Sequence, residues 1–581
     1  MTVLTTISSR IGTLSKWWRD VPLLPTIRLP RIRWSLLLPL LIALLVLLPI
    51  ASLVIEILTP DVELWQQMLD TFLPRVVLNT LMLVAGVGIG TFIIGTSFAW
   101  LVTAYDFPGR RFFDHMLLLP LAIPTFVMGF TFLAIFEFAG PVQTQLREWF
   151  GRDVWFPDVH STGGVILVLT LVLYPYVYIL ARAAFREQTA STFEAAQMMG
   201  YNRLQTFFKL VLPLARPSLV AGTILAMMEA LTDFGAVKFF SVPTLSERIV
   251  IIWEGRFDRA AATELASLLL LFALAMILLE RALRGKAKFY QQGGASKGRR
   301  PKRAQMRGWH RWTATAACTG LIGFAFALPV FQLVIWGLGE LHDSSFGSWQ
   351  NIYGDYIANS VTLAGTAAGV VILLALVMAH GVRGGSGRGE GRRLPRFLAR
   401  MVTLGYAMPG AVIAAGVLFF ISPVDGAVTR FAENVFGYDN PAYLLTGTMV
   451  ALTYAYLVRF MAVGYNSVES SLDKITPNME QAARTMGAGP LRVLRRIHLP
   501  LVSTGMAAGA ILIFVDVMKE LPATLMLRPF GMDTLALWSY FLANEGFWEA
   551  AAIPALTILV VGLIPVFILM RVGDQHGRTH H

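Results

Sequence analysis

The chain has 581 residues, of which 55% are hydrophobic and only 14% are charged, and its formal net charge is +12. A soluble domain carries about a quarter charged residues, so this composition excludes an ordinary soluble protein and places the chain in a membrane. The apolar segments are long and continuous, which excludes the short alternating strands of a membrane barrel and predicts spanning helices.

Residues 1–34 form a basic leader, and the first apolar segment, near 35–57, is too long for the core of a signal peptide. We therefore expect a retained first helix, followed by eleven more spans in two sets of six. The first set lies near residues 35–57, 78–101, 115–138, 163–183, 217–238 and 263–283. The second set lies near residues 314–338, 359–380, 398–421, 442–464, 503–527 and 551–572.

The two sets form an internal repeat. Gly200 and Gly487 are 287 residues apart, and so are Pro213 and Pro500. Because six spans per half is an even number, both halves face the same way. We predict an all-α polytopic membrane protein of twelve transmembrane helices, with its halves related by a pseudo-two-fold axis along the membrane normal.

The predicted boundaries are a first half over 35–283, a linker over 284–313, a second half over 314–572 and a tail over 573–581. The leader, the linker and the 381–400 loop are basic, whereas 56–70 and 339–355 are acidic. Since Lys and Arg collect in cytoplasmic loops, this pattern predicts that both termini, the leader, the linker and the tail are cytoplasmic. The linker should contact anionic membrane lipid, and we expect no nucleic-acid partner.

One short pattern occurs in the polar loop before the fifth span of each half, with the same spacing. The first copy contains Glu194, Ala195, Ala196, Gly200 and Pro213, and the second contains Gln481, Ala482, Ala483, Gly487 and Pro500, preceded by Glu480. The alanines favour a short helix whose low face lets a partner approach, and the glycine permits a turn. The proline suits the first turn of the next span. The pattern predicts a helix–turn–helix that fits a groove on a cytoplasmic partner.

These loops resemble the signature of permeases of bacterial ABC importers, which reads E-A-A, three residues, G, nine residues, I-x-L-P. The resemblance implies an inner-membrane subunit whose loops dock on two copies of an ABC ATPase, while a periplasmic solute-binding protein delivers the solute. It implies that ATP and magnesium belong to the ATPase subunits, that this chain binds no cofactor or metal of its own, and that it is not an enzyme. The sequence contains no G-x-x-x-x-G-K-[ST] phosphate loop, which agrees with that division of labour. Gln481 departs from the signature glutamate, which leaves open whether both halves grip their ATPase equally.

Segments 228–235, 519–525 and 527–530 look most like the ferric-iron permeases of this family, and thiamine, phosphonate and polyamine permeases are the alternatives. An ion-coupled secondary transporter of twelve spans is a rival reading, but it predicts no docking loops. A membrane enzyme would require a catalytic constellation, and the sequence shows none.

Several ionisable residues fall inside predicted spans, where they are costly and indicate function. Glu229 and Asp233 are four residues apart, which would place them on one helix face, and Asp516 and Glu520 repeat the spacing beside Lys519. One hypothesis is that these residues line the translocation path or its gate, where a negative field suits a cation. The alternative is a structural network around Lys519 that fixes helix packing.

Overall fold

The computed structural model describes residues 37–188, 196, 198–256, 259–284, 303–343, 349–385, 393–403, 405, 408–436, 445–473, 475 and 477–578. The predicted leader, most of the linker and the end of the tail lie outside these residues. Within the described ranges, eleven helices are long and apolar enough to cross a membrane. The predicted span near 442–464 is a continuous helix, α20 (Met449–Leu472), but it is not among the eleven. Arg459 and Asn466 lie within it and lower its mean hydropathy.

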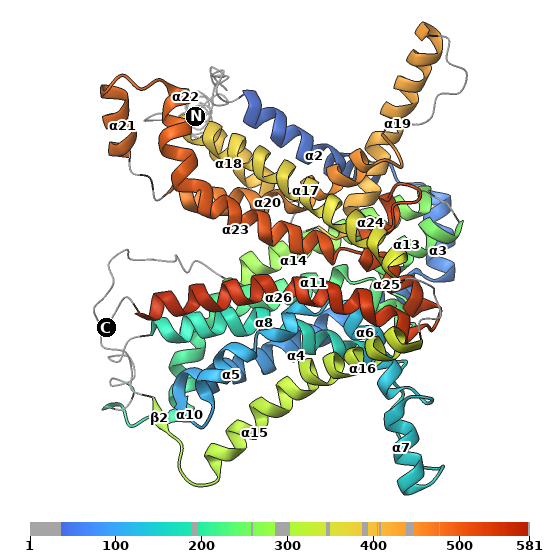
Figure 1. Cartoon of the computed structure of the whole chain (residues 1–581), viewed down its shortest axis with the longest axis vertical. Helices are drawn as coiled ribbons and strands as arrows, with labels where there is room; N and C mark the ends of the chain where they lie inside the picture. Colours follow the sequence, from blue (N-terminus) through green and yellow to red (C-terminus); the bar gives the residue numbers. More distant parts are fainter. Residues whose placement is uncertain are drawn as a thin grey trace, which may run out of the picture.

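Among the described residues of the first half, the regular elements are helices apart from one short strand (Figure 1). Its elements are α2 (Leu37–Leu58), α3 (Val62–Thr71), α4 (Leu73–Ala104), β1 (Tyr105–Asp106), α5 (Arg110–Met116), η2 (Leu119–Ala122), α6 (Thr125–Phe136), α7 (Pro141–Phe150), α8 (Thr162–Glu187), α10 (Arg203–Thr206), η3 (Phe207–Val211), α11 (Leu212–Thr232), α12 (Gly235–Phe239), α13 (Leu245–Arg256) and α14 (Arg259–Arg284).

The second half repeats this order after the strand β2 (Ala304–Gln305). Its elements are α15 (His310–Ile322), η4 (Gly323–Ala327), α16 (Leu328–Asp343), α17 (Trp349–Gly385), α18 (Arg393–Val402), α19 (Gly410–Phe436), α20, α21 (Pro477–Thr485), α22 (Pro490–Val493), η7 (Leu494–His498), α23 (Leu499–Met518), α24 (Pro522–Leu527), α25 (Leu535–Asn544) and α26 (Trp548–Arg578).

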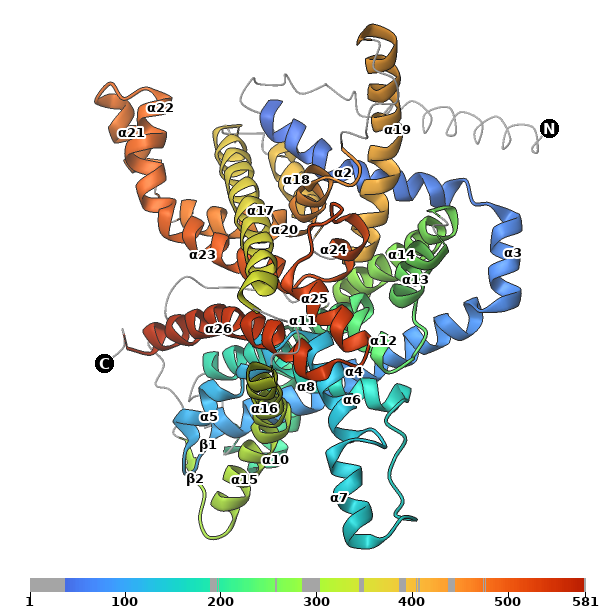
Figure 2. The same ribbon diagram turned by 45° about the vertical axis from the view of Figure 1, so that its right-hand side comes forward.

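The first span of each half reaches across to the other half. Helix α2 packs on α17, α18 and α19 of the second half and on α14 of its own half, and α16 packs on α26 of its own half and on α6 of the first half. Figure 2 shows α2 beside α17 to α19, and α16 between α26 and α6. The two halves therefore interlock, because each one is clasped by a helix that belongs to the other in sequence.

Equivalent polar contacts hold both halves in the same way. Asn79 Nδ2 donates to the Pro243 carbonyl at 3.1 Å, and Asn359 Nδ2 donates to the Asp533 carbonyl at 3.1 Å. The residue after each asparagine, Thr80 or Ser360, accepts through its hydroxyl from the first backbone N–H of α13 or α25. Each pair ties a long central helix to the loop that follows a short helix, α12 or α24.

Four predicted spans are broken, and prolines or carboxylates mark most of the breaks. The segment predicted as one span over 115–138 is divided into α5, η2 and α6, with Pro120 and Pro124 at the interruptions. The 398–421 segment is divided into α18 and α19, and Pro409 precedes α19. The spans predicted over 217–238 and 503–527 end early, at Thr232 and Met518. A proline cannot donate to the preceding turn, which favours a break at these positions, although α8 and α19 continue through Pro175 and Pro423.

Candidate functional site

Each half carries a short helical hairpin, hairpin 1 (residues 196 and 198–211) and hairpin 2 (residues 477–498). Figure 1 shows α10 of hairpin 1 and α21 and α22 of hairpin 2 at the same end of the bundle, opposite α3, α13 and α25. The predicted residues Glu194 and Ala195 lie outside the described residues. Glu480 and Gln481 lie in α21.

The glycine of each motif makes the predicted turn in a left-handed backbone conformation. The φ angles of Gly200 and Gly487 are 76° and 82°. The Tyr201 N–H donates to the Ala196 carbonyl at 3.0 Å, and the Ala488 N–H donates to the Ala483 carbonyl at 3.0 Å. This five-residue closure across a left-handed glycine is the Schellman motif, which satisfies a carbonyl at the end of a helix. The spacing from the second alanine to the glycine is therefore the spacing that this turn requires.

The low face that the alanines were expected to offer a partner is only partly available. Ala196 is fully buried and Ala483 is buried, so the second alanine of each motif packs against its own chain. Ala482 is exposed. Of the motif alanines that the structure describes, Ala482 is therefore the one that remains accessible to a partner.

Large apolar side chains take the exposed positions instead. Met198 is 89% exposed and Met486 is 80% exposed. Leu204, Phe208 and Met479 are also exposed on the two hairpins. Exposed apolar side chains clustered on a projecting element are typical of a docking surface, and flexible methionines adapt to a partner.

A π-helical turn joins each hairpin to the membrane helix that follows it. The turns η3 and η7 end two residues before Pro213 and Pro500, which lie in the first turn of α11 and α23. The third π turn of the described ranges, η4, ends two residues before Pro329. An α-helix would bring the proline ring against the carbonyl four residues earlier. The wider turn avoids this clash, because Leu212 donates to the Phe207 carbonyl five residues back.

A buried carboxylate, that of Asp114 in α5, joins α5 to α8. Asp114 Oδ1 accepts from Arg182 Nη1 at 2.8 Å, and Arg186 pairs with the other carboxylate oxygen. The Tyr178 hydroxyl donates to the Asp114 carbonyl at 3.0 Å. Burial alone would raise the pKa of Asp114, but the two guanidinium groups outweigh burial and hold that pKa below its usual value.

At the centre of the bundle, all five predicted gate residues line one cavity of about 130 Å³. They are Glu229, Asp233, Asp516, Lys519 and Glu520. The cavity also contains Arg459, which the sequence analysis missed. An arginine inside a predicted span was the available signal, because ionisable groups in spans mark functional sites.

The predicted sharing of one helix face by Glu229 and Asp233 is wrong. Helix α11 ends at Thr232, and Asp233 instead accepts from the backbone N–H groups of Ala236 and Val237 at the start of α12. Glu520 does the same for Ala523 and Thr524 at the start of α24. In both halves a carboxylate thus caps a short helix inside the membrane region, where its charge suits the helix N-terminus.

Two ion pairs lie in this cavity, both from the second half. Arg459 Nη1 lies 3.0 Å from Glu520 Oε1, and Lys519 Nζ lies 2.9 Å from Asp516 Oδ1. Four carboxylates face two cationic groups, an excess of two negative charges when all are ionised. In the described ranges, no group of three or more His, Cys, Asp or Glu residues could hold a metal ion.

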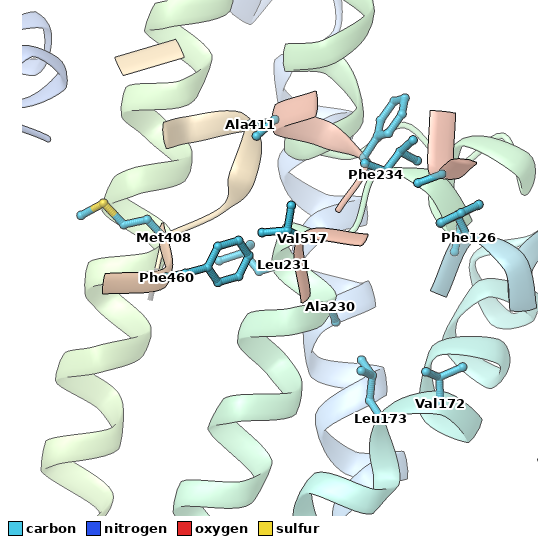
Figure 3. Close-up of a cluster of buried hydrophobic side chains, with 14 of the residues drawn as sticks. Phe126, Val172, Leu173, Ala230, Leu231, Phe234, Met408, Ala411, Phe460 and Val517 are labelled. Atoms are coloured by element: carbon cyan, nitrogen blue, oxygen red, sulfur yellow. The ribbon is translucent and has the colours of Figure 1, made fainter. Parts of the chain in front are cut away.

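Apolar side chains of both halves surround the charged cavity. Figure 3 shows Phe126, Leu231 and Phe234 of the first half in the same cluster as Phe460 and Val517 of the second. All five are buried. Buried apolar side chains from both halves therefore border the charged cavity.

The chain matches the family "Binding-protein-dependent transport system inner membrane component" twice, over residues 92–286 and 371–578. The matches fall one in each half, and each contains one hairpin and its share of the central cavity.

Several curated relatives are similar. The "Fe(3+)-transport system permease protein FbpB 2" of Haemophilus influenzae is 26% identical over 544 residues, 93% of this chain and 98% of the relative. The "Ferric transport system permease protein FbpB" of Actinobacillus pleuropneumoniae is 24% identical over 87% of this chain and 72% of the relative. The "Sulfate transport system permease protein CysT" of Salmonella typhimurium is 30% identical over 42% of this chain and 89% of the relative. This chain therefore belongs to the family of inner-membrane components of binding-protein-dependent transport systems, with two copies of the family's domain fused in one polypeptide.

Proposed function

We propose that this permease carries ferric iron from a periplasmic solute-binding protein to the cytoplasm, driven by two ATPase subunits that grip hairpins 1 and 2. The observation that carries the proposal is the central cavity, where carboxylates of both halves outnumber cationic groups. Carboxylate oxygens suit hard cations, whereas a sulfate or phosphonate would be repelled. The names of the two ferric-transport relatives support the same cargo.

Each hairpin is joined to the cavity by a single helix. Helix α11 has 21 residues and carries Glu229 near its far end. Helix α23 has 20 residues and carries Asp516 near its far end. At 1.5 Å per residue each helix is about 30 Å long, roughly the thickness of the hydrocarbon core. A movement of a hairpin is therefore transmitted to the charged end of its helix without an intervening loop.

In this mechanism the ATPases draw the hairpins together when they bind ATP, and the apolar cluster around the cavity opens on the periplasmic side. The energy enters through contacts that differ between the two states of the bundle. The hairpin end of the bundle would be cytoplasmic, and the basic leader, linker and 381–400 loop predict the same side for both chain termini. ATP hydrolysis belongs to the partner subunits, and this chain contributes the path and the docking surfaces.

The test is uptake of radioactive ferric iron into proteoliposomes that hold the permease and its ATPase, with ATP and the solute-binding protein supplied. We expect uptake of iron and not of sulfate. The variant Asp233→Asn/Glu520→Gln should lose uptake while retaining the ATPase. The control Glu148→Gln/Asp153→Asn changes two exposed carboxyls outside the cavity and should keep normal uptake. Normal uptake by a well-assembled Asp233→Asn/Glu520→Gln protein would remove the gate assignment. Uptake of thiamine, a phosphonate or a polyamine in place of iron would contradict the assignment of ferric iron as the cargo.

A further inference from the structure

The end of the linker is fastened beside hairpin 1 by a two-stranded parallel ladder. Strand β2 pairs with β1, placing Ala304 opposite Tyr105, and the Met306 N–H donates to the Asp106 carbonyl at 3.1 Å. Farther along, Thr315 of α15 donates to the Pro108 carbonyl at 3.0 Å. The start of the second half is thus held against the end of α4.

A cavity of about 610 Å³ lies at this junction, which we call the strap cavity. Its lining includes three basic residues, Arg203 of α10, Arg307 and His310. It also includes apolar residues, among them Leu101 of α4 and Ala314 of α15. None of the residues that line the cavity is acidic. The nearby carboxylate of Asp106 pairs with Arg110 at 3.3 Å, so it is already compensated.

The strap cavity lies where a helix enters the apolar layer. Trp309 and Trp312, at the start of α15, are 68% and 56% exposed. Exposed tryptophans at the end of a span mark the level of lipid headgroups. The apolar lining continues from this level along α15 through Ala314 and Ala317, which lie on one side of the helix because they are three residues apart.

We propose that the strap cavity binds one anionic phospholipid of the adjacent leaflet. Arg203, Arg307 and His310 would surround its phosphate, and one acyl chain would lie along Leu101, Ala314 and Ala317. A basic pocket between spanning helices is the kind of site that recognises anionic headgroups. Because Arg203 belongs to hairpin 1 and Arg307 to the end of the linker, the lipid joins a docking element to the segment that connects the two halves.

The test is native mass spectrometry of the full chain, titrated with phosphatidylglycerol or phosphatidylcholine of matched acyl chains. We expect selective binding of one phosphatidylglycerol. Arg203→Gln/Arg307→Gln should weaken it about twenty-five-fold, because each cationic residue near an anionic surface contributes about fivefold. Arg203→Lys/Arg307→Lys should keep the preference, which shows that charge and not folding is responsible.

The matched control is Arg281→Gln/Arg495→Gln, which removes one exposed arginine from α14 and one from hairpin 2. Equal binding of the two lipids by the natural chain, or an equal loss in the control, would overturn the proposal. Displacement of the lipid by millimolar glycerol phosphate would also overturn it, because the site would then take a soluble phosphate. No cargo or ATPase is present in this experiment, so its outcome is independent of the proposed transport function.

Discussion

Arg459 of α20 reaches across to Glu520, the residue that caps α24, and pairs with it at 3.0 Å. The first half has no such arginine at the equivalent place, since Val172 lies 287 residues before Arg459 and lines the same cavity. The repeat is thus symmetric in its helix caps and asymmetric in its charges. The cationic groups in the cavity come from one half only.

We predict that Arg459→Met destabilises the protein by about 3–5 kcal/mol, because removing one partner leaves the other as an uncompensated buried charge. The double variant Arg459→Met/Glu520→Gln should recover most of that loss, since glutamine keeps an oxygen for the cap of α24 and carries no charge. Thermal unfolding in detergent measures both. If the double variant is as unstable as the single one, the pair does not act through its charges.

The left-handed glycines give a second prediction. Gly200→Val and Gly487→Val should each cost about 1–2 kcal/mol locally, because a side chain strains a positive φ angle. Both should lose ATP-driven uptake while inserting normally. Gly489→Val is the control, because Gly489 is in the same hairpin, has open space around it and no left-handed backbone. Equal uptake by the Gly487 and Gly489 variants would contradict the role of the turn.

The π turns give a third prediction. Pro500→Ala restores an N–H to the chain, so η7 can relax into an α-helical turn. Losing the extra residue of the π turn rotates hairpin 2 by roughly 100° relative to α23. Hairpin 2 would then present another face to its partner, and uptake would fall. Pro329→Ala makes the same change at η4, outside both hairpins, and should leave uptake intact. A comparable effect of the two substitutions would argue against this account.

The Asp114 cluster predicts a pH dependence. The pKa of Asp114 is lowered in the folded chain, so its stabilising contribution is fully present above the usual aspartate value and is lost as pH falls through the folded value. Melting temperatures should therefore decline below about pH 4. Asp114→Asn should remove that part of the decline and lower stability at neutral pH. A pH profile unchanged by the substitution would show that the cluster does not contribute.

Hydropathy and the 287-residue repeat predicted the helical fold and the hairpins because these features are periodic or local in sequence. The helix breaks at Asp233 and Glu520 were not predicted, because an acid four residues after another fits an unbroken helix equally well. Their roles as caps depend on the tertiary position of α12 and α24. The reach of α2 and α16 across to the other half depends on long-range packing, which no local pattern encodes.

The central claim is that both hairpins are held by a nucleotide-driven partner on the cytoplasmic side, and cross-linking tests it most directly. The only cysteine, Cys318, is buried, so a Cys318→Ala background allows single thiols at Met198→Cys, Met486→Cys or, at an exposed site outside the hairpins, Trp155→Cys. We predict that the two hairpin thiols cross-link to the ATPase in an ATP-dependent manner and that Trp155→Cys does not. Cross-linking at Trp155→Cys with none at either hairpin would contradict the account.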